Sequence, residues 1–297
     1  MKLAFLTMVW RDYWLLEKWV AHNSRIVPKR SLYVINHGGD PEVDRIAQGC
    51  NLIHVPRDEV TVDLTRRRWT LLGQITNGLL AFHDRVICTD VDEFLVYCGE
   101  KSGLLAHLEA KLSEGDALSP VGLNLIPTEH DDADMTLPVL ARHRHALVSP
   151  KYTKPCIARS EVKYTIGGHG LIRGRFEIDP EILLFHLHYV TPDYTERMAA
   201  RQDIVRDAKA ANDAADDPQK VPGRFWINWS KPDMIRNKEI EILSRARPVE
   251  VAEGFGECAD ILRAAVVSQG RKTVVDSAPI NKDPRYVLVP EGMKDRV

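Results

Sequence analysis

The sequence predicts an α/β fold with a doubly wound, mostly parallel sheet flanked by helices. Strand-length apolar runs alternate with stretches of helical periodicity over residues 3–55, and turn residues separate them. Residues 86–88 are β-branched and small, which is typical of a parallel strand buried on both faces. The order strand, helix, strand, helix, strand indicates right-handed crossovers.

The first predicted strand is the apolar run Leu3–Val9, and a helical pattern follows over residues 13–27. Arg11 and Asp12 interrupt the apolar run, and no small-residue cleavage site follows it, so we interpret it as a strand and not as a signal peptide. The helical pattern places its larger apolar side chains on one face: Leu15, Leu16, Trp19, Val20 and Ile26.

The second and third predicted strands are residues 32–35 and 51–55. Residues 36–40 between them have turn chemistry. Asp40 is expected to cap a short helix that has Pro41 at its first position and ends at Gly49.

A longer helix is predicted over residues 64–83, with one apolar half and one polar half. At 100° per residue, Arg67, Gln74 and Asn77 share the polar half, whereas Arg68 turns toward the opposite face. Arg, Gln and Asn are donors suited to phosphates and sugar hydroxyls, so this face is either a ligand surface or a plain solvated one.

The most informative stretch is residues 85–94, a short buried strand that ends in three acids, Asp90, Asp92 and Glu93. Like charges this close disfavour one another unless a cation neutralises them. The carboxyl ends of strands in open α/β sheets are also where ligands bind. The stretch therefore predicts a bound metal or cationic ligand.

A second polar pair lies in the apolar run 182–190, which we predict to be a strand. Alternation places His186 and His188 on one face of it. Two adjacent imidazoles are typical of a metal or phosphate site.

Beyond the acidic stretch, Ser102 is expected to cap a helix that Gly115 ends, and residues 117–126 are expected to form a strand. Residues 127–134 form a polar loop that is either a surface loop or an acceptor-side loop.

From residue 193 the pattern becomes helical, with an aromatic run at 225–229. The segment from Val274 contains three prolines and is expected to be an extended tail. We expect two parts, residues 1–192 and a helical extension over 193–297.

Composition narrows the function classes. A net charge of −2 argues against a nucleic-acid partner, and no run approaches the roughly 18 apolar residues of a membrane span. Five cysteines without zinc-type spacing favour a reducing compartment. We expect a cytoplasmic location, or one peripheral to the inner face of a membrane.

The stretch Thr89-Asp90-Val91-Asp92-Glu93-Phe94 resembles the Asp-x-Asp signature of nucleotide-sugar-dependent glycosyltransferases with the GT-A fold, in the version typical of family-2-like and family-92-like branches. The resemblance covers about residues 1–205. It implies a metal-dependent, inverting hexosyltransferase that moves sugar from a UDP- or GDP-sugar to a glycan or other hydroxyl acceptor, in surface glycan or polysaccharide synthesis.

The resemblance also implies roles for particular residues. Asp92 would bind Mn²⁺ or Mg²⁺, Asp90 the ribose or the metal through water, and His188 the metal from the other side, with His186 as its substitute. Lys154 and Arg159 would face the donor phosphates, as would the helix that carries Arg67, Gln74 and Asn77. The candidates for the general base are Glu93, Glu129, Asp131 and His169.

The chain departs from the family-2-like pattern in two places. It has Trp10-Arg11-Asp12 where these enzymes have an Asn-Glu pair, and residues 36–40 where they have an Asp-rich turn. We therefore expect base and sugar recognition to differ from that pattern. A non-catalytic GT-A-like scaffold is an open alternative. An Asp-x-Asp phosphatase is disfavoured because it needs Thr or Val where Phe94 stands. The sugar, the acceptor and the oligomeric state stay open.

Overall fold

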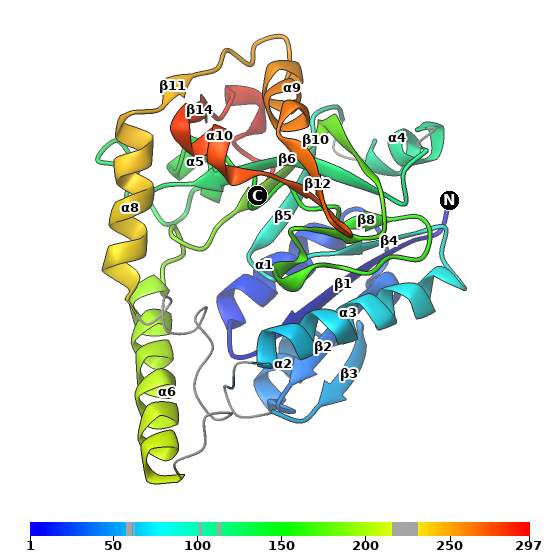
Figure 1. Cartoon of the computed structure of the whole chain (residues 1–297), viewed down its shortest axis with the longest axis vertical. Helices are drawn as coiled ribbons and strands as arrows, with labels where there is room; N and C mark the ends of the chain where they lie inside the picture. The colour runs from blue at the N-terminus through cyan, green and yellow to red at the C-terminus, as the bar shows by residue number, and fades with distance from the viewer. Residues whose placement is uncertain (58–60, 62, 101–102, 112–113, 216–230) are drawn as a thin grey trace.

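The computed structural model describes residues 1–57, 61, 63–100, 103–111, 114–215 and 231–297. A large mixed sheet forms its centre, and a smaller sheet lies beside it (Figure 1). The strands are β1 (Leu3–Val9), β2 (Leu32–His37), β3 (Asn51–Val55), β4 (Arg85–Cys88), β5 (Glu93–Tyr97), β6 (Ala117–Leu125), β7 (His145–Val148), β8 (Ile157–Ala158), β9 (Gly170–Ile172), β10 (Phe176–His186), β11 (Arg247–Pro248), β12 (Val266–Gln269), β13 (Lys272–Val275) and β14 (Arg285–Leu288). The helices are α1 (Tyr13–Asn23), α2 (Pro41–Ile46), α3 (Leu64–Leu80), α4 (Leu104–Ala110), α5 (Val139–Arg142), α6 (Tyr194–Ala215), α8 (Pro232–Ser244), α9 (Gly256–Ala264) and α10 (Ser277–Lys282), with 3₁₀ turns at Lys29–Ser31, Ile166–Gly168 and Glu291–Met293.

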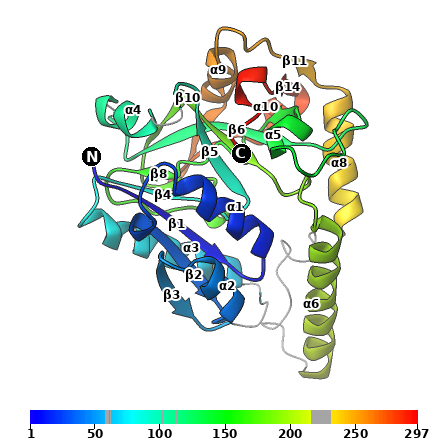
Figure 2. The same ribbon diagram turned by 180° about the vertical axis from the view of Figure 1, so that it is seen from behind.

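The N-terminal part of the large sheet is parallel, in the order β4-β1-β2-β3. Helices α1 and α2 cover one face of it and α3 covers the other, as the two opposite views show (Figures 1 and 2). Strand β1 is buried along its whole length because strands flank it on both edges and helices cover both faces. The predicted α/β class with a parallel sheet flanked by helices is confirmed.

Local chemistry explains where the second crossover helix begins. Asp40 accepts a hydrogen bond from the Glu42 amide at 2.9 Å, and Pro41 occupies the first turn of α2, as predicted. Asn36 Oδ1 in turn accepts from the Asp40 amide at 2.9 Å, which closes the turn between β2 and α2. The start of this helix is thus fixed by residues that are close together in the chain.

The rest of the large sheet is mixed. Strand β8 is antiparallel to both β4 and β6, and β10 runs parallel to β6 and antiparallel to β5. Strand β10 ends at His186, so the predicted strand over 182–190 extends too far and His188 lies in the turn that follows. The sharp reversal from β4 into β5 puts the acidic residues at the edge where the parallel strands end.

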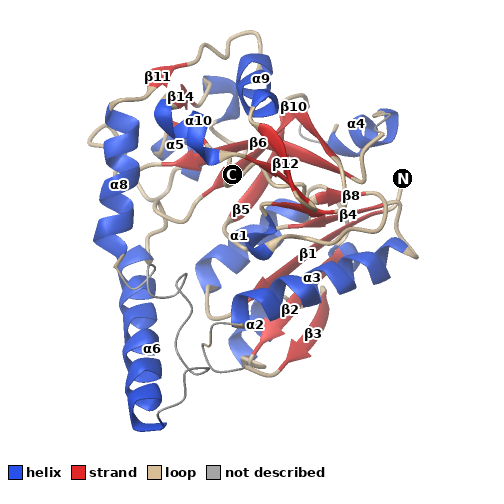
Figure 3. Ribbon diagram, in the orientation of Figure 1, coloured by secondary structure: helices blue, strands red, loops and turns tan. Residues whose placement is uncertain are grey.

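The C-terminal part contains the expected helices, and α6 and α8 lie along one side of the molecule (Figure 3). The segment from Val274 is not an extended tail. Strand β14 pairs with β7 in the large sheet, β13 pairs with β9, and Val287 and Val289 are fully buried. The division near residue 192 stays a prediction. The expected cap Ser102 and the aromatic run 225–229 lie outside the described residues.

Candidate functional site

The acidic residues lie in the turn between β4 and β5. The Asp90 amide donates to Glu93 Oε2 at 3.0 Å, and the Glu93 amide donates back to the Asp90 carbonyl at 3.1 Å. The Asp92 carbonyl accepts from the Leu187 amide at 2.9 Å, which brings the end of β10 to the same turn. Three strand ends therefore hold the carboxylates and the two histidines together.

Asp92, His186 and His188 form a cluster that we call the Asp-His-His cluster. Asp92 Oδ2 lies 3.3 Å from His188 Nδ1 and 3.5 Å from His186 Nε2. The two imidazole rings are stacked, with centroids 5.7 Å apart, and one ligand atom from each of the three residues lies within 4.8 Å of the others. The structure thus brings together the three residues expected to bind a metal.

The hydrogen bonds around His186 fix which of its nitrogens carries a proton. Asn124 directs its amide nitrogen to the Glu239 carboxylate at 3.3 Å, so its carbonyl oxygen faces His186 Nδ1 at 2.8 Å. Because that oxygen only accepts, Nδ1 donates to it. In the neutral ring Nε2 is then a lone pair facing the Asp92 carboxylate. Two acceptors that face each other need a cation between them, either a proton on Nε2 or a metal ion, and an amide that orients a ligating imidazole is typical of metal sites.

His188 is suited to the same cation. Burial lowers its pKa to about 3, against the opposing effect of Asp92, so the ring is neutral at ordinary pH. A neutral imidazole is the form that binds metals. Burial raises the pKa of Asp92, but His186 and His188 outweigh it and hold that pKa well below its usual range. The donor set of one carboxylate and two imidazoles fits a divalent transition metal.

Asp90 has different partners from Asp92. Arg68 donates to its Oδ1 at 2.5 Å and Lys154 to its Oδ2 at 2.8 Å. Burial raises the pKa of Asp90, but these two cations outweigh it and hold the pKa well below its usual range. Arg68 and Lys154 therefore supply part of the positive charge that the acidic stretch requires. A contact of Asp90 with a metal or a ribose stays a prediction.

Glu93 supports the turn from inside the protein. Its carboxyl group lies 2.6 Å from the Lys154 ammonium, and its side chain is 1 % exposed. Burial raises the pKa of Glu93 to about 7 in spite of Lys154. Because both oxygens contact the turn and Lys154, this position favours a structural role over that of a base in contact with an acceptor.

Helix α6 closes one side of the cluster. Arg197 donates to the His188 carbonyl at 3.1 Å and forms an ion pair with Asp12 at 3.2 Å. Arg201, one turn further on, is close enough to Asp12 and Asp92 for their charges to act on its pKa, which burial lowers. The region next to the cluster is thus rich in guanidinium groups.

Helix α3 presents a different arginine from the one expected. Arg68 contacts Asp90, although the helical wheel turned it away from the site, whereas Arg67 and Gln74 are exposed. Asn77 holds the Val162 backbone at both its amide and carbonyl, each at 2.9 Å. The helical wheel gave the wrong orientation for Arg68. A wheel shows which residues share a face of α3, but it does not show which face lies toward the turn that carries Asp90.

Arg159 lies at the other end of the sheet from Lys154. Strand β8 is antiparallel to β4, with Ala158 opposite Val86, so Arg159 lies beside Arg85 at the start of β4. At about 3.3 Å per residue, this is roughly 15 Å from Asp90. Arg159 therefore does not lie with Lys154, contrary to the expectation that the two residues face the donor phosphates together.

The remaining candidate bases are in different surroundings. His169 donates through Nδ1 to the Lys151 carbonyl at 2.8 Å, and burial followed by Lys154 lowers its pKa to about 4. Asp131 pairs with His143 at 2.6 Å, and the Glu129 side chain is 88 % exposed. His169 thus lies close enough to Lys154 and Asp90 for their charges to act on its pKa. Asp131 is instead bonded to Thr128 and His143.

Sequence reasoning missed Arg68, Asn124 and Arg197. Each reaches the site from an element distant in the chain, and an isolated Asn or Arg carries no signal of its own. Only the run of three arginines at 66–68 could have drawn attention to Arg68.

The similarities found between this chain and known proteins are distant. No family model matches the chain, and no curated protein matches it. Among solved structures, the chain is similar to mannose-1-phosphate geranyltransferase from Thermus thermophilus, at 14 % identity and a TM-score of 0.30, covering 68 % of this chain and 61 % of that one. It is also similar to the mannosyltransferase PcManGT from Pyrobaculum calidifontis in complex with GDP-Man and Mn²⁺, at 12 % identity and a TM-score of 0.33, covering 71 % and 64 %. The chain thus spans less than two thirds of the length of either.

A search of the described residues found no helix with the length and apolar character to cross a membrane.

Proposed function

We propose that this chain is a metal-dependent glycosyltransferase that moves a hexosyl group from a UDP- or GDP-sugar to a hydroxyl of a glycan or other acceptor. The observation that carries the proposal is the Asp-His-His cluster beside Lys154 and Arg68. A metal-binding donor set and two cationic side chains meet at the carboxyl edge of parallel strands, where α/β proteins bind ligands.

The cluster favours Mn²⁺ over Mg²⁺, because Mg²⁺ prefers oxygen ligands whereas imidazole suits later metals. Asp92, His186 and His188 would hold the ion. When bound, it would act as a Lewis acid that offsets the charge developing on the departing nucleoside diphosphate.

The side chains next to the cluster would position the donor. Lys154 and Arg68 are held 2.8 Å and 2.5 Å from Asp90 and carry charges that a pyrophosphate could share. Asp90 would fix these cations before the donor arrives, so that they need little rearrangement. Glu93 would keep the turn in register through the Asp90 amide.

The acceptor side is less defined. His169 has its Nδ1 proton on a carbonyl, which leaves Nε2 as an acceptor for a hydroxyl proton. Its low pKa makes it a weak base, and Glu129 and Asp131 stay candidates. Inversion at the transferred sugar, a role in surface glycan or polysaccharide synthesis, and a cytoplasmic location are further parts of the proposal.

The test is release of nucleoside diphosphate from a panel of UDP- and GDP-sugars, with Mn²⁺ and with EDTA. We expect one donor to be turned over with Mn²⁺ and not with EDTA, and Asp92→Asn to lose that turnover. Asp207→Asn removes a carboxylate from the exposed surface of α6 and should behave as wild type. If no donor reacts under any condition, a non-catalytic binding module becomes the better hypothesis. Equal turnover in EDTA would exclude the metal role.

A further inference from the structure

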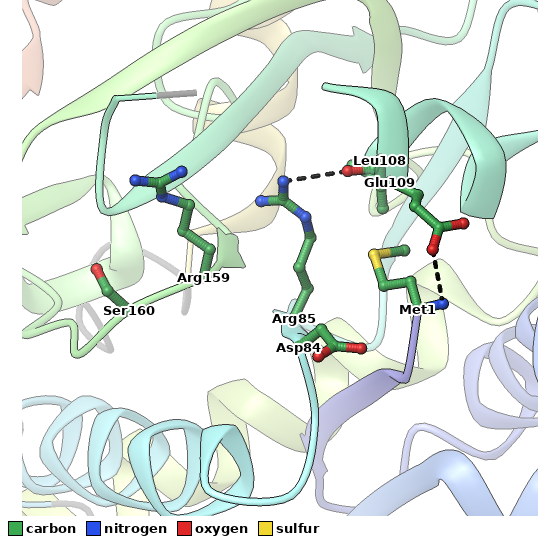
Figure 4. Close-up of a pocket in the computed structure, with 7 residues that line it drawn as sticks. All are labelled: Met1, Asp84, Arg85, Leu108, Glu109, Arg159 and Ser160. Atoms are coloured by element: carbon green, nitrogen blue, oxygen red, sulfur yellow. Dashed lines mark hydrogen bonds and ion pairs between the residues drawn. The ribbon is translucent and has the colours of Figure 1, made fainter. Parts of the chain in front are cut away.

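A polar cavity lies at the opposite end of the parallel strands from the Asp-His-His cluster. Its volume is about 500 Å³, within the range of roughly 300–1,000 Å³ typical of small-molecule pockets. Figure 4 shows the residues that line it, which are Met1, Asp84, Arg85, Leu108, Glu109, Arg159 and Ser160.

Arg85 is the most unusual residue of this cavity. It is only 7 % exposed, although it is charged. Its Nη2 donates to the carbonyls of Leu108 and Lys111, at 3.1 Å and 3.2 Å, and so caps the end of α4. Its Nη1 is buried and makes no hydrogen bond within the described structure. A buried donor on a charged group without an acceptor is costly unless a ligand or water satisfies it.

Arg159 brings a second positive charge to the same place. The β4 and β8 register sets it beside Arg85, and Figure 4 shows its guanidinium on the side of Arg85 away from Leu108. Neither guanidinium forms an ion pair among the described residues. Burial, and then the charge of Arg159, lower the pKa of Arg85 against the opposing charge of Asp84.

The acidic groups of the cavity have other partners. Asp84 accepts a hydrogen bond from the Lys2 amide at 2.5 Å, and Glu109 binds the Met1 amino group at 3.2 Å. Ser160 donates its hydroxyl proton to Asp116 at 2.9 Å, so the two arginines are the donors that face the cavity.

We propose that this cavity binds the phosphate group of a soluble small molecule between Arg85 and Arg159. Guanidinium groups bind phosphate through paired, charge-assisted hydrogen bonds, and two of them match the two negative charges of a phosphate monoester. The volume leaves room for the rest of such a molecule. The proposal does not depend on the glycosyltransferase function, because the site lies roughly 15 Å away along β4.

The test uses inorganic phosphate as the probe, with sodium chloride at matched ionic strength as the reference. Phosphate should raise the melting temperature of the wild-type chain, and calorimetry should give its Kd. Arg159→Gln removes one exposed guanidinium and should weaken phosphate binding by roughly tenfold or more. Arg206→Gln, which removes the same charge from the exposed face of α6, should leave the Kd unchanged.

Equal phosphate affinity in Arg159→Gln and wild type would overturn the proposal, since any binding would then lie elsewhere, for example at Lys154. Vesicles of phosphatidic acid and phosphatidylcholine separate a soluble ligand from a lipid one. We expect no co-sedimentation that depends on Arg159, and co-sedimentation lost in Arg159→Gln would overturn the assignment to a soluble molecule.

Discussion

Asp92 Oδ2 and His186 Nε2 face each other at 3.5 Å, and the hydrogen bond from His186 Nδ1 to Asn124 keeps the ring proton on the far side of the imidazole. Asn124 is itself oriented by Glu239. A chain of contacts that runs from Glu239 to Asp92 thus prepares one nitrogen lone pair to face one carboxylate.

Replacing Asn124 by Leu should therefore weaken Mn²⁺ binding without removing any ligand. Loss of a group that orients a metal ligand typically costs about 10–100-fold in metal affinity. Mn²⁺ titration by calorimetry measures this, and thermal unfolding confirms that the variant folds. An unchanged Mn²⁺ affinity in a folded variant would show that the amide does not orient the imidazole for a metal.

The two histidines should contribute unequally. His188 is nearer to Asp92 and 1 % exposed, so His188→Ala should raise the Mn²⁺ concentration required for donor binding more than His186→Ala does. Parallel Mn²⁺ titrations of the two variants provide the comparison. Small and equal effects would reduce the pair to a packing feature.

Arg68 and Arg67 form a matched pair of neighbouring arginines. Arg68→Ala should weaken nucleotide-sugar binding by about 1.5–3 kcal/mol, the range for hydrogen bonds to charged groups, because Arg68 lies at the cluster. The exposed Arg67 should matter less. Calorimetry with the same donor decides the order. A larger loss of affinity in Arg67→Ala would instead support the prediction that the face with Arg67, Gln74 and Asn77 binds the donor.

Lys154 should be important for stability as well as for binding. It is 3 % exposed and lies between two buried carboxylates, so Lys154→Met leaves Asp90 and Glu93 without that cation. Removing one partner of a buried ion pair typically costs about 3–5 kcal/mol. Urea unfolding should show a loss of this size, and adding Glu93→Gln should recover part of it. If Lys154→Met alone is as stable as wild type, then Arg68 is sufficient to balance the negative charge of the turn.

Much of the fold could be predicted because its signals are local. The Asp40 cap and the apolar β1 each depend on residues close together in the chain. The pattern failed for β14, because Pro284 and Pro290 bracket this strand and made an ordered segment resemble a tail.

The candidate site could likewise be predicted only in part. That Asp92, His186 and His188 lie together could be predicted, because acids and histidines are unusual next to buried strands. Arg68 was missed and Arg159 misplaced, because their positions depend on how α3 crosses the sheet and on the antiparallel register of β8. Neither is encoded in a short window of sequence.

The proposed function requires that the Asp-His-His cluster bind a metal on which the nucleotide-sugar donor depends. The most direct measurement is calorimetric titration of UDP- and GDP-sugars into the wild-type chain with Mn²⁺, with EDTA, and into Asp92→Asn with Mn²⁺. We expect one donor to bind only with Mn²⁺, and Asp92→Asn to lose this binding while remaining folded. Donor binding of equal affinity in EDTA or in Asp92→Asn would contradict this expectation.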